Sequence, residues 1–154
     1  MVGKNATNFS YAFEGTNVQY IPAGILDNCV KGTRAFCVSK VSNAAEGVTL
    51  KSLKVGTEMF SGCPMSYAVS KRLYDTLPQA TDAVMPTNRN DKVDYFITFA
   101  CIQGEEEQIA QTFDIPANNP NTSAPWTGGY GIPKAEYGQF WLSSKGWYIT
   151  FAHN

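Results

Sequence analysis

The chain contains 154 residues, of which 44% are hydrophobic and 16% are charged, and its net charge is −1. With 12 basic and 13 acidic side chains it lacks the positive excess of an electrostatic nucleic-acid binder, so no nucleic-acid partner is expected. No stretch reaches the roughly 18 consecutive apolar residues that span a bilayer, which argues against membrane insertion. The first residues also lack the apolar segment of a signal peptide. The length predicts one domain, residues 1–154.

Phenylalanines recur at a nearly constant spacing in the first part of the chain. Phe13, Phe36 and Phe60 lie 23 and 24 residues apart, each inside a related short motif. A period of this size is typical of stacked repeats, in which each repeat buries its apolar face against the next. We therefore expect residues 9–63 to form short coils in which the three rings stack. Other apolar positions keep the same spacing and are expected to align as well: Val18 with Val41, Ile21 with Ala44, Ile25 with Val48, and Val30 with Leu53.

These motifs resemble those of the BspA-type leucine-rich-repeat proteins. The resemblance rests on Ser10-Tyr-Ala-Phe-Glu-Gly15, on Ile21-Pro22, and on Gly56-Thr-Glu-Met-Phe-Ser-Gly-Cys63. The second unit departs from the pattern, because Cys37-Val38 stands where Gly-Cys is expected, and no asparagine ladder is evident. The resemblance implies an α/β fold, a short solenoid with a parallel sheet.

The remaining residues, 64–154, are expected to form two longer helix–strand units that cap the solenoid. Ser66 is the predicted N-cap of a helix over 67–77, which is followed by a strand over 94–100. A second helix is predicted over 134–145, with Gly146 as its C′ residue, followed by a strand over 147–152. Both strands contain Ile-Thr-Phe-Ala, 52 residues apart, and are expected to extend one sheet in parallel. The alternative fold is a β-rich sandwich with strands at 18–21, 48–55, 94–100 and 147–152.

The cysteines do not form a metal-binding pattern. Cys29, Cys37, Cys63 and Cys101 contain no Cys-x-x-Cys pair, so no metal site or cofactor is expected. Cysteine is among the residue types most often buried, and we expect these side chains to fill space inside the coils. A disulfide from Cys29 to Cys37 or Cys63 remains open at this stage, because spacing alone does not decide it.

The sequence also contains little that favours catalysis. The sole histidine is His153, next to the C-terminus, where a side chain is poorly held for general-base chemistry. No Gly-x-Ser-x-Gly, Walker A or His-Glu-x-x-His motif occurs. We therefore expect a protein that is not an enzyme.

The best binding candidate is the long loop over residues 114–133. Its aromatic side chains lie among amides and hydroxyls, a combination that suits sugar rings through stacking and hydrogen bonds. The alternative is that Trp126 packs into the core and fixes the loop. The predicted binding residues are Trp126, Tyr130, Asn119, Asn121 and Thr127.

Together these features favour a non-enzymatic binding or adhesion module. Its expected location is a virion or an extracellular surface, as a phage virion or tail-fibre component. The resemblance implies that it recognises a cell-surface protein or glycan. The alternative is a purely structural virion or assembly protein that packs against sister subunits, and a homo-oligomer is compatible with either.

Overall fold

The structure is a computed structural model that describes residues 5–101 and 140–153, and within them it is a mixed α/β protein. One helix and two small sheets are present in this part of the chain, and neither sheet closes into a barrel. The smaller sheet pairs β1 (Tyr20–Ile21) with β2 (Asn43–Ala44) in parallel. The larger sheet has the order β3-β4-β6-β5. Its strands are β3 (Val55–Gly56), β4 (Phe96–Cys101), β5 (Trp141–Leu142) and β6 (Tyr148–His153).

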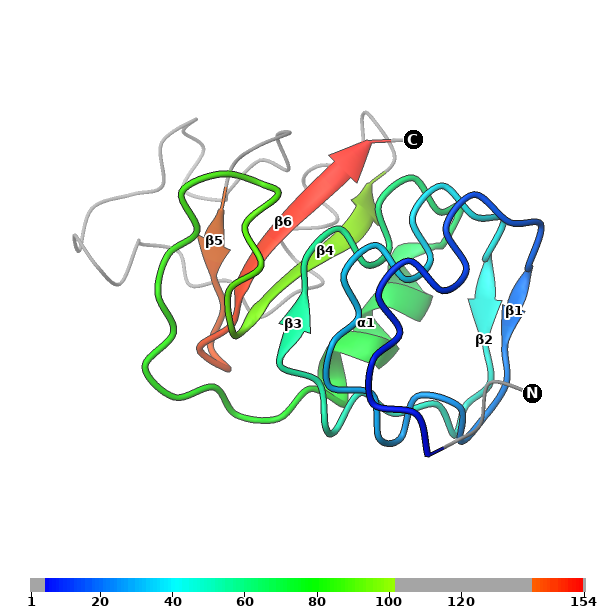
Figure 1. Cartoon of the computed structure of the whole chain (residues 1–154), viewed down its shortest axis with the longest axis horizontal. Helices are drawn as coiled ribbons and strands as arrows, with labels where there is room; N and C mark the ends of the chain where they lie inside the picture. The colour runs from blue at the N-terminus through cyan, green and yellow to red at the C-terminus, as the bar shows by residue number, and fades with distance from the viewer. Residues whose placement is uncertain (1–4, 102–139, 154) are drawn as a thin grey trace.

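Three chain segments that contain the repeated phenylalanines lie side by side (Figure 1). We call them the first, second and third turn segments, residues 9–15, 32–38 and 56–62. From Tyr11 onwards, every second N–H of the first segment donates to a carbonyl of the second, as from Phe13 to Ala35 at 2.8 Å. The second segment donates to the third in the same way, as from Phe36 to Met59 at 2.9 Å. The parallel register therefore repeats with the sequence period.

Each turn segment is a succession of tight turns. The N–H of Ala12 bonds back to the carbonyl of Phe9 at 2.9 Å, and equivalent bonds recur in the other two segments. Turns of type II require a positive φ at their third residue, a conformation that glycine adopts without penalty. The segments provide it two residues before and two residues after each phenylalanine. The residues concerned are Tyr11, Arg34 and Glu58 before it, and Gly15, Val38 and Gly62 after it.

The expected stacking of the phenylalanine rings is confirmed. Phe13 and Phe36 have ring centroids 5.3 Å apart, and Phe36 and Phe60 are 5.7 Å apart, with interplanar angles of 9° and 2°. Phe99 of β4 continues the stack, with its ring centroid 5.7 Å from that of Phe60. The predicted alignment of Ile21 with Ala44 is also confirmed, as these two residues are register partners in β1 and β2. The core therefore runs continuously from the coils into the larger sheet.

Helix α1 (Tyr67–Asp75) begins where the sequence predicts. The Ser66 hydroxyl accepts the Val69 N–H at 3.3 Å, the bond expected of an N-cap. The helix ends at Asp75, slightly before the predicted residue 77, with Thr76 as its C-cap. Its buried face, which includes Leu73 and Tyr74, packs into the same core as the coils.

The two Ile-Thr-Phe-Ala segments pair as predicted. Strands β4 and β6 are parallel, with Ile97 opposite Ile149 and Phe99 opposite Phe151. Identical residues therefore lie opposite each other along the shared motif. The inward-facing phenylalanines Phe99 and Phe151 are both fully buried.

The helix predicted over 134–145 is wrong where the structure describes it. Residues Trp141 and Leu142 form β5, which pairs antiparallel with β6, and the Ser143 carbonyl accepts the Gly146 N–H in the connecting turn. Gly146 has the positive φ expected of a helix C′ residue, 82°, but a tight hairpin turn makes the same demand. Residues 134–139 lie outside the described part of the chain.

A strand over 48–55 is also wrong for most of its length. The Leu53 N–H donates to the Leu50 carbonyl at 3.0 Å, which closes a turn, and only Val55 of this stretch belongs to a strand. Residues three apart in a strand face opposite sides of the sheet. The turn instead allows both leucines to be fully buried.

The thiols of Cys29, Cys37 and Cys63 are buried and free, so the disulfide left open by the sequence does not form among them. Cys63 is held by hydrogen bonding, since its Sγ donates to the Phe36 carbonyl at 2.9 Å. The side chains of these three cysteines are buried, as expected.

Candidate functional site

The binding residues predicted from sequence lie outside the described residues. This applies to Trp126, Tyr130, Asn119, Asn121 and Thr127, and to the whole 114–133 loop. The structure places another candidate site on the outer face of the turn segments.

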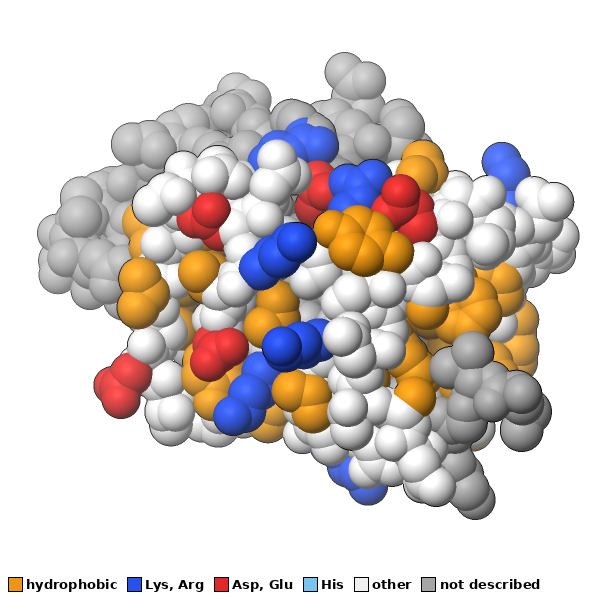
Figure 2. Space-filling view, viewed as in Figure 1, with side chains coloured by type: hydrophobic (Ala, Val, Ile, Leu, Met, Phe, Trp, Pro, Cys, Tyr) orange, Lys and Arg blue, Asp and Glu red, His pale blue; other side chains and the backbone are white. Residues whose placement is uncertain are grey.

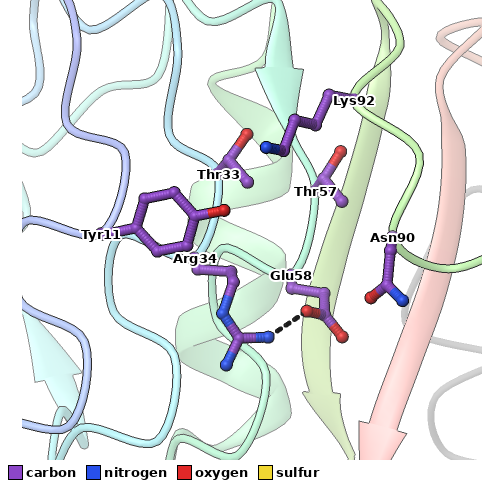
Figure 3. Close-up of a pocket in the computed structure, with 7 residues that line it drawn as sticks. All are labelled: Tyr11, Thr33, Arg34, Thr57, Glu58, Asn90 and Lys92. Atoms are coloured by element: carbon purple, nitrogen blue, oxygen red, sulfur yellow. Dashed lines mark hydrogen bonds and ion pairs between the residues drawn. The ribbon is translucent and has the colours of Figure 1, made fainter.

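This site is an open cavity of about 450 Å³, within the size range of small-molecule pockets (Figure 3). Its wall on one side is built by the three turn segments, and on the other by the chain just before β4. The lining residues are Tyr11, Thr33, Arg34, Thr57, Glu58, Asn90 and Lys92. We call this cavity the coil pocket.

The repeat places three of these side chains. Tyr11, Arg34 and Glu58 occupy the same position in successive segments, two residues before the stacked phenylalanine. All three have a positive φ, of 63°, 53° and 52°. The period that stacks the phenylalanines in the core therefore aligns an aromatic, a basic and an acidic residue at the pocket. Non-glycine residues with positive φ carry backbone strain and often occur at functional sites.

The charged groups in the wall of the pocket form a network. Arg34 Nε donates to Glu14 Oε2 at 2.7 Å, and its Nη1 donates to Glu58 Oε2. Arg89 Nη2 donates to the other Glu58 oxygen at 3.1 Å. The bond to Glu14, together with the Glu58 carboxylate, raises the pKa of Arg34 above its usual range. Figure 2 shows acidic and basic side chains adjoining on this face.

Glu58 is the most enclosed charge of this network, with its side chain only 4% exposed. A buried carboxylate loses its hydrating water, and charged hydrogen-bond donors must compensate this loss. The guanidinium groups of Arg34 and Arg89 do so for Glu58. Its backbone is fixed as well, because the Glu58 N–H donates to Thr98 Oγ1 in β4 at 2.9 Å. The network is therefore anchored to the larger sheet.

Lys92 and Tyr11 form the open side of the pocket. The Lys92 Nζ lies 5.8 Å from the centroid of the Tyr11 ring, within the range of a cation–π contact. Within residues 5–101 and 140–153, no carboxylate is close enough to form an ion pair with Lys92. Tyr11 is 48% exposed, so its ring is available to a ligand.

The loop that carries Asn90 and Lys92 is held in shape by Asp91. Its Oδ2 accepts hydrogen bonds from the Thr87 N–H and hydroxyl, both at 2.6 Å. These bonds lower the pKa of Asp91. In addition, the Thr57 hydroxyl donates to the Asp91 carbonyl at 2.5 Å, which joins the loop to the third turn segment. The pocket therefore has two walls in a defined relation to each other.

Sequence reasoning missed this site, although one signal for it was available. The equivalent positions of Tyr11, Arg34 and Glu58 follow from the same alignment that predicts the phenylalanine stack. The alignment could not predict that Asn90 and Lys92 line the same pocket. Their position depends on contacts between residues more than 30 positions apart in the sequence, such as Arg89 with Glu58.

A second open cavity of about 380 Å³ lies between the 81–84 stretch and residues 93–95. It contains the carboxylates of Asp82 and Asp94 beside the exposed Val84. No cluster of three or more potential metal ligands occurs at either cavity or elsewhere in the described residues.

Comparison of the chain with protein families, curated proteins and solved structures finds no match. Among the described residues, no helix has the length and apolar character needed to cross a bilayer.

Proposed function

We propose that this protein is a non-enzymatic binding module that recognises a cell-surface glycan or protein through the coil pocket. The observation that carries the proposal is the half-exposed Tyr11 ring beside the hydrogen-bonding side chains of Thr33, Asn90 and Lys92. An aromatic face with nearby polar groups suits a sugar ring, which presents C–H groups on its faces and hydroxyls at its edge. The cavity volume of about 450 Å³ suits one or two sugar units.

The state of the carboxylates supports binding over catalysis. A general base must be free to accept a proton from the substrate. Glu58 is bonded to two guanidinium groups and Glu14 to one, so both carboxylates are already used as acceptors. Among the described residues that line the pocket there is no histidine or cysteine.

We further propose a short leucine-rich-repeat-like solenoid of the BspA type as the architecture, on a virion or an extracellular surface. The regular register of the three turn segments supports the solenoid. The sequence resemblance supports the location and the role of phage tail-fibre component.

The proposal is tested by a glycan array and by binding to whole cells, with Tyr11→Ala compared with the unmodified chain. Tyr20→Ala is the matched control, because Tyr20 is 50% exposed and does not line the pocket. We expect Tyr11→Ala to weaken binding about tenfold, since an aromatic contact contributes roughly 1 kcal/mol or more. Tyr20→Ala should bind as the unmodified chain does.

A third variant, Trp126→Ala, separates the coil pocket from the site predicted by the sequence. If Trp126→Ala abolishes binding without changing the melting temperature while Tyr11→Ala has no effect, the coil pocket is not the ligand site. Unaltered binding by both variants would contradict both sites.

An assembly role is the second candidate, and one observation favours it. The carbonyls of Ser10, Ala12 and Glu14 correspond to second-segment carbonyls that accept hydrogen bonds, yet no described residue donates to them. Phe13 likewise has only one ring partner among the described residues, Phe36. Unpaired backbone edges of this kind favour pairing with another chain. Light scattering tests this role. If the chain binds no ligand but forms a stable oligomer, and Phe13→Ala dissociates that oligomer, the result would favour assembly.

A further inference from the structure

One cation of the coil pocket, Lys92, forms no ion pair with any carboxylate of the described residues, and this indicates the class of ligand. Among the described residues, the carboxylates of Glu14 and Glu58 pair with the guanidinium groups of Arg34 and Arg89. Lys92 is a further positive charge at the pocket. Its neighbour Asp91 keeps its negative charge, but the Asp91 carboxylate accepts hydrogen bonds from Thr87 and Asn88 and forms no ion pair with Lys92.

The polar groups of the pocket include one that can only donate hydrogen bonds, the ammonium of Lys92. Figure 3 shows the Tyr11 hydroxyl and the Lys92 ammonium directed into the space between the two walls, with Thr33 beside Lys92. An ammonium group carries three N–H donors and no acceptor. Hydrogen bonds from a charged donor to an anion are roughly twice as strong as neutral ones. This side of the pocket therefore suits a negatively charged oxygen group.

We propose that the coil pocket binds a sugar residue carrying a single negative charge, with the anionic group at Lys92 and the ring face against Tyr11. This inference rests on the proposed function, since it names the ligand class of the same site. The distance of 5.8 Å between the Lys92 Nζ and the Tyr11 ring centroid brings both contacts within the span of one sugar residue.

A single charge follows from the surrounding groups. Only one ammonium lacks a carboxylate partner among the lining residues, because Arg34 is held by Glu14 and Glu58. A dianionic phosphate monoester would carry a second negative charge, and the described residues that line the pocket offer no second unpaired cation to match it. Carboxylate sugars and sulfate esters both carry one charge, so they share the required chemistry.

The test is a titration followed by NMR of the isotopically labelled full chain. The probes are glucuronate, galacturonate and N-acetylneuraminate, each compared with its methyl ester, which removes only the charge. Glucose sulfate is compared with glucose to distinguish a carboxylate from a sulfate ligand. We expect at least one acid to bind about tenfold more tightly than its neutral counterpart, and more weakly as salt is added.

Lys92→Met should remove this preference, lowering affinity for the acid about tenfold and leaving affinity for the ester unchanged. Lys92→Arg should keep the preference. The matched control is Lys51→Met, since Lys51 is also exposed and does not line the pocket. Circular dichroism checks that each variant is folded.

Two results would overturn the inference: equal affinity of the unmodified chain for acid and ester, or an unchanged preference in Lys92→Met. If acid and ester bind the unmodified chain equally well and Tyr11→Ala loses binding to both, the proposed sugar-binding function stands but the anionic ligand class is wrong. Failure of every sugar to bind would remove both the ligand class and the recognition of glycans by this pocket.

Discussion

Val38 and Gly15 occupy the same position in successive turn segments, and both have a positive φ, of 51° and 69°. This conformation costs a non-glycine residue roughly 1–2 kcal/mol, and a β-branched residue fits it poorly. Val38 also buries little surface, being 57% exposed. We expect Val38→Gly to stabilise the fold by about 0.5–1 kcal/mol. The substitution relieves the backbone strain at this position, but glycine gives the unfolded chain more conformational entropy, which offsets part of the gain.

Gly15→Ala is the reciprocal variant. A methyl group at Gly15 would meet nothing within 4 Å, so only the backbone conformation opposes it. A loss of about 1 kcal/mol is expected. Urea unfolding measures both changes, and a destabilised Val38→Gly together with an unaffected Gly15→Ala would contradict the role of φ at this position.

The buried thiols predict how stability depends on alkaline pH. Burial raises the pKa of Cys29 to about 12 and that of Cys63 to about 11. In the unfolded chain these thiols lose their protons near pH 9. As pH rises from about 9 towards 11–12, the unfolded state therefore releases protons that the folded state retains, and the folded state loses stability.

Denaturant unfolding at a series of pH values measures this decline, and Cys29→Ala should make it less steep. The folded thiols at positions 29 and 63 should also resist alkylation at pH 8, as read by mass spectrometry after digestion. Rapid modification of either thiol in the absence of denaturant would show that it is not held in the core.

The phenylalanine stack is the element that joins the coils to the larger sheet. Phe36 has a ring partner on each side, Phe13 and Phe60, and is 2% exposed. Phe13 has one such partner and is only partly buried. We expect Phe36→Ala to cost about 3–5 kcal/mol, the usual range for a buried phenylalanine, and Phe13→Ala to cost distinctly less.

Phe36→Leu is a useful intermediate variant, because it keeps most of the apolar volume but removes the ring. Its expected cost is well below that of Phe36→Ala. Equal losses for Phe13→Ala and Phe36→Ala, measured by urea unfolding, would mean that the outer ring is as enclosed as the central one.

The stack and the parallel pairing of β4 with β6 were predictable because each depends on like residues at a fixed spacing. Ile97 opposite Ile149 follows directly from the shared Ile-Thr-Phe-Ala segments. The helix cap at Ser66 was predictable for another reason, since capping depends on neighbouring residues only.

The errors occurred where local sequence supports two structures. Trp141 is almost fully buried in β5, and its pairing with β6 outweighs the helical pattern of its neighbours. Gly146 fits a helix end and a hairpin equally well. The coil pocket was missed because one of its walls, with Asn90 and Lys92, belongs to a loop whose position depends on the contact of Arg89 with Glu58.

Helix α1 connects the coils to the hairpin across the whole molecule. The Arg72 side chain donates to the Ala44 carbonyl in β2 at 3.0 Å, and the Thr76 hydroxyl accepts the Leu50 N–H at 2.9 Å. At the other side, Lys145 donates to the carbonyls of Asp75 and Leu77 at 2.8 and 2.9 Å. These contacts join α1 to two segments, one around Ala44 and Leu50 and one at Lys145, that are distant from the helix and from each other in the sequence.

We therefore expect the molecule to unfold as one unit. Repeat proteins in which each coil contacts only its neighbours can open from one end. Here the buried Leu73 of α1 lies in the same core cluster as Phe36 of the coils and Trp147 of the hairpin, so loss of one part exposes the others. Tryptophan fluorescence and far-ultraviolet circular dichroism should give coincident urea transitions. Leu73→Ala should move both midpoints together, with a cost of about 2–5 kcal/mol. Separate midpoints would mean that the coils and the hairpin unfold independently, and that the bonds from Lys145 to the end of α1 do not couple them.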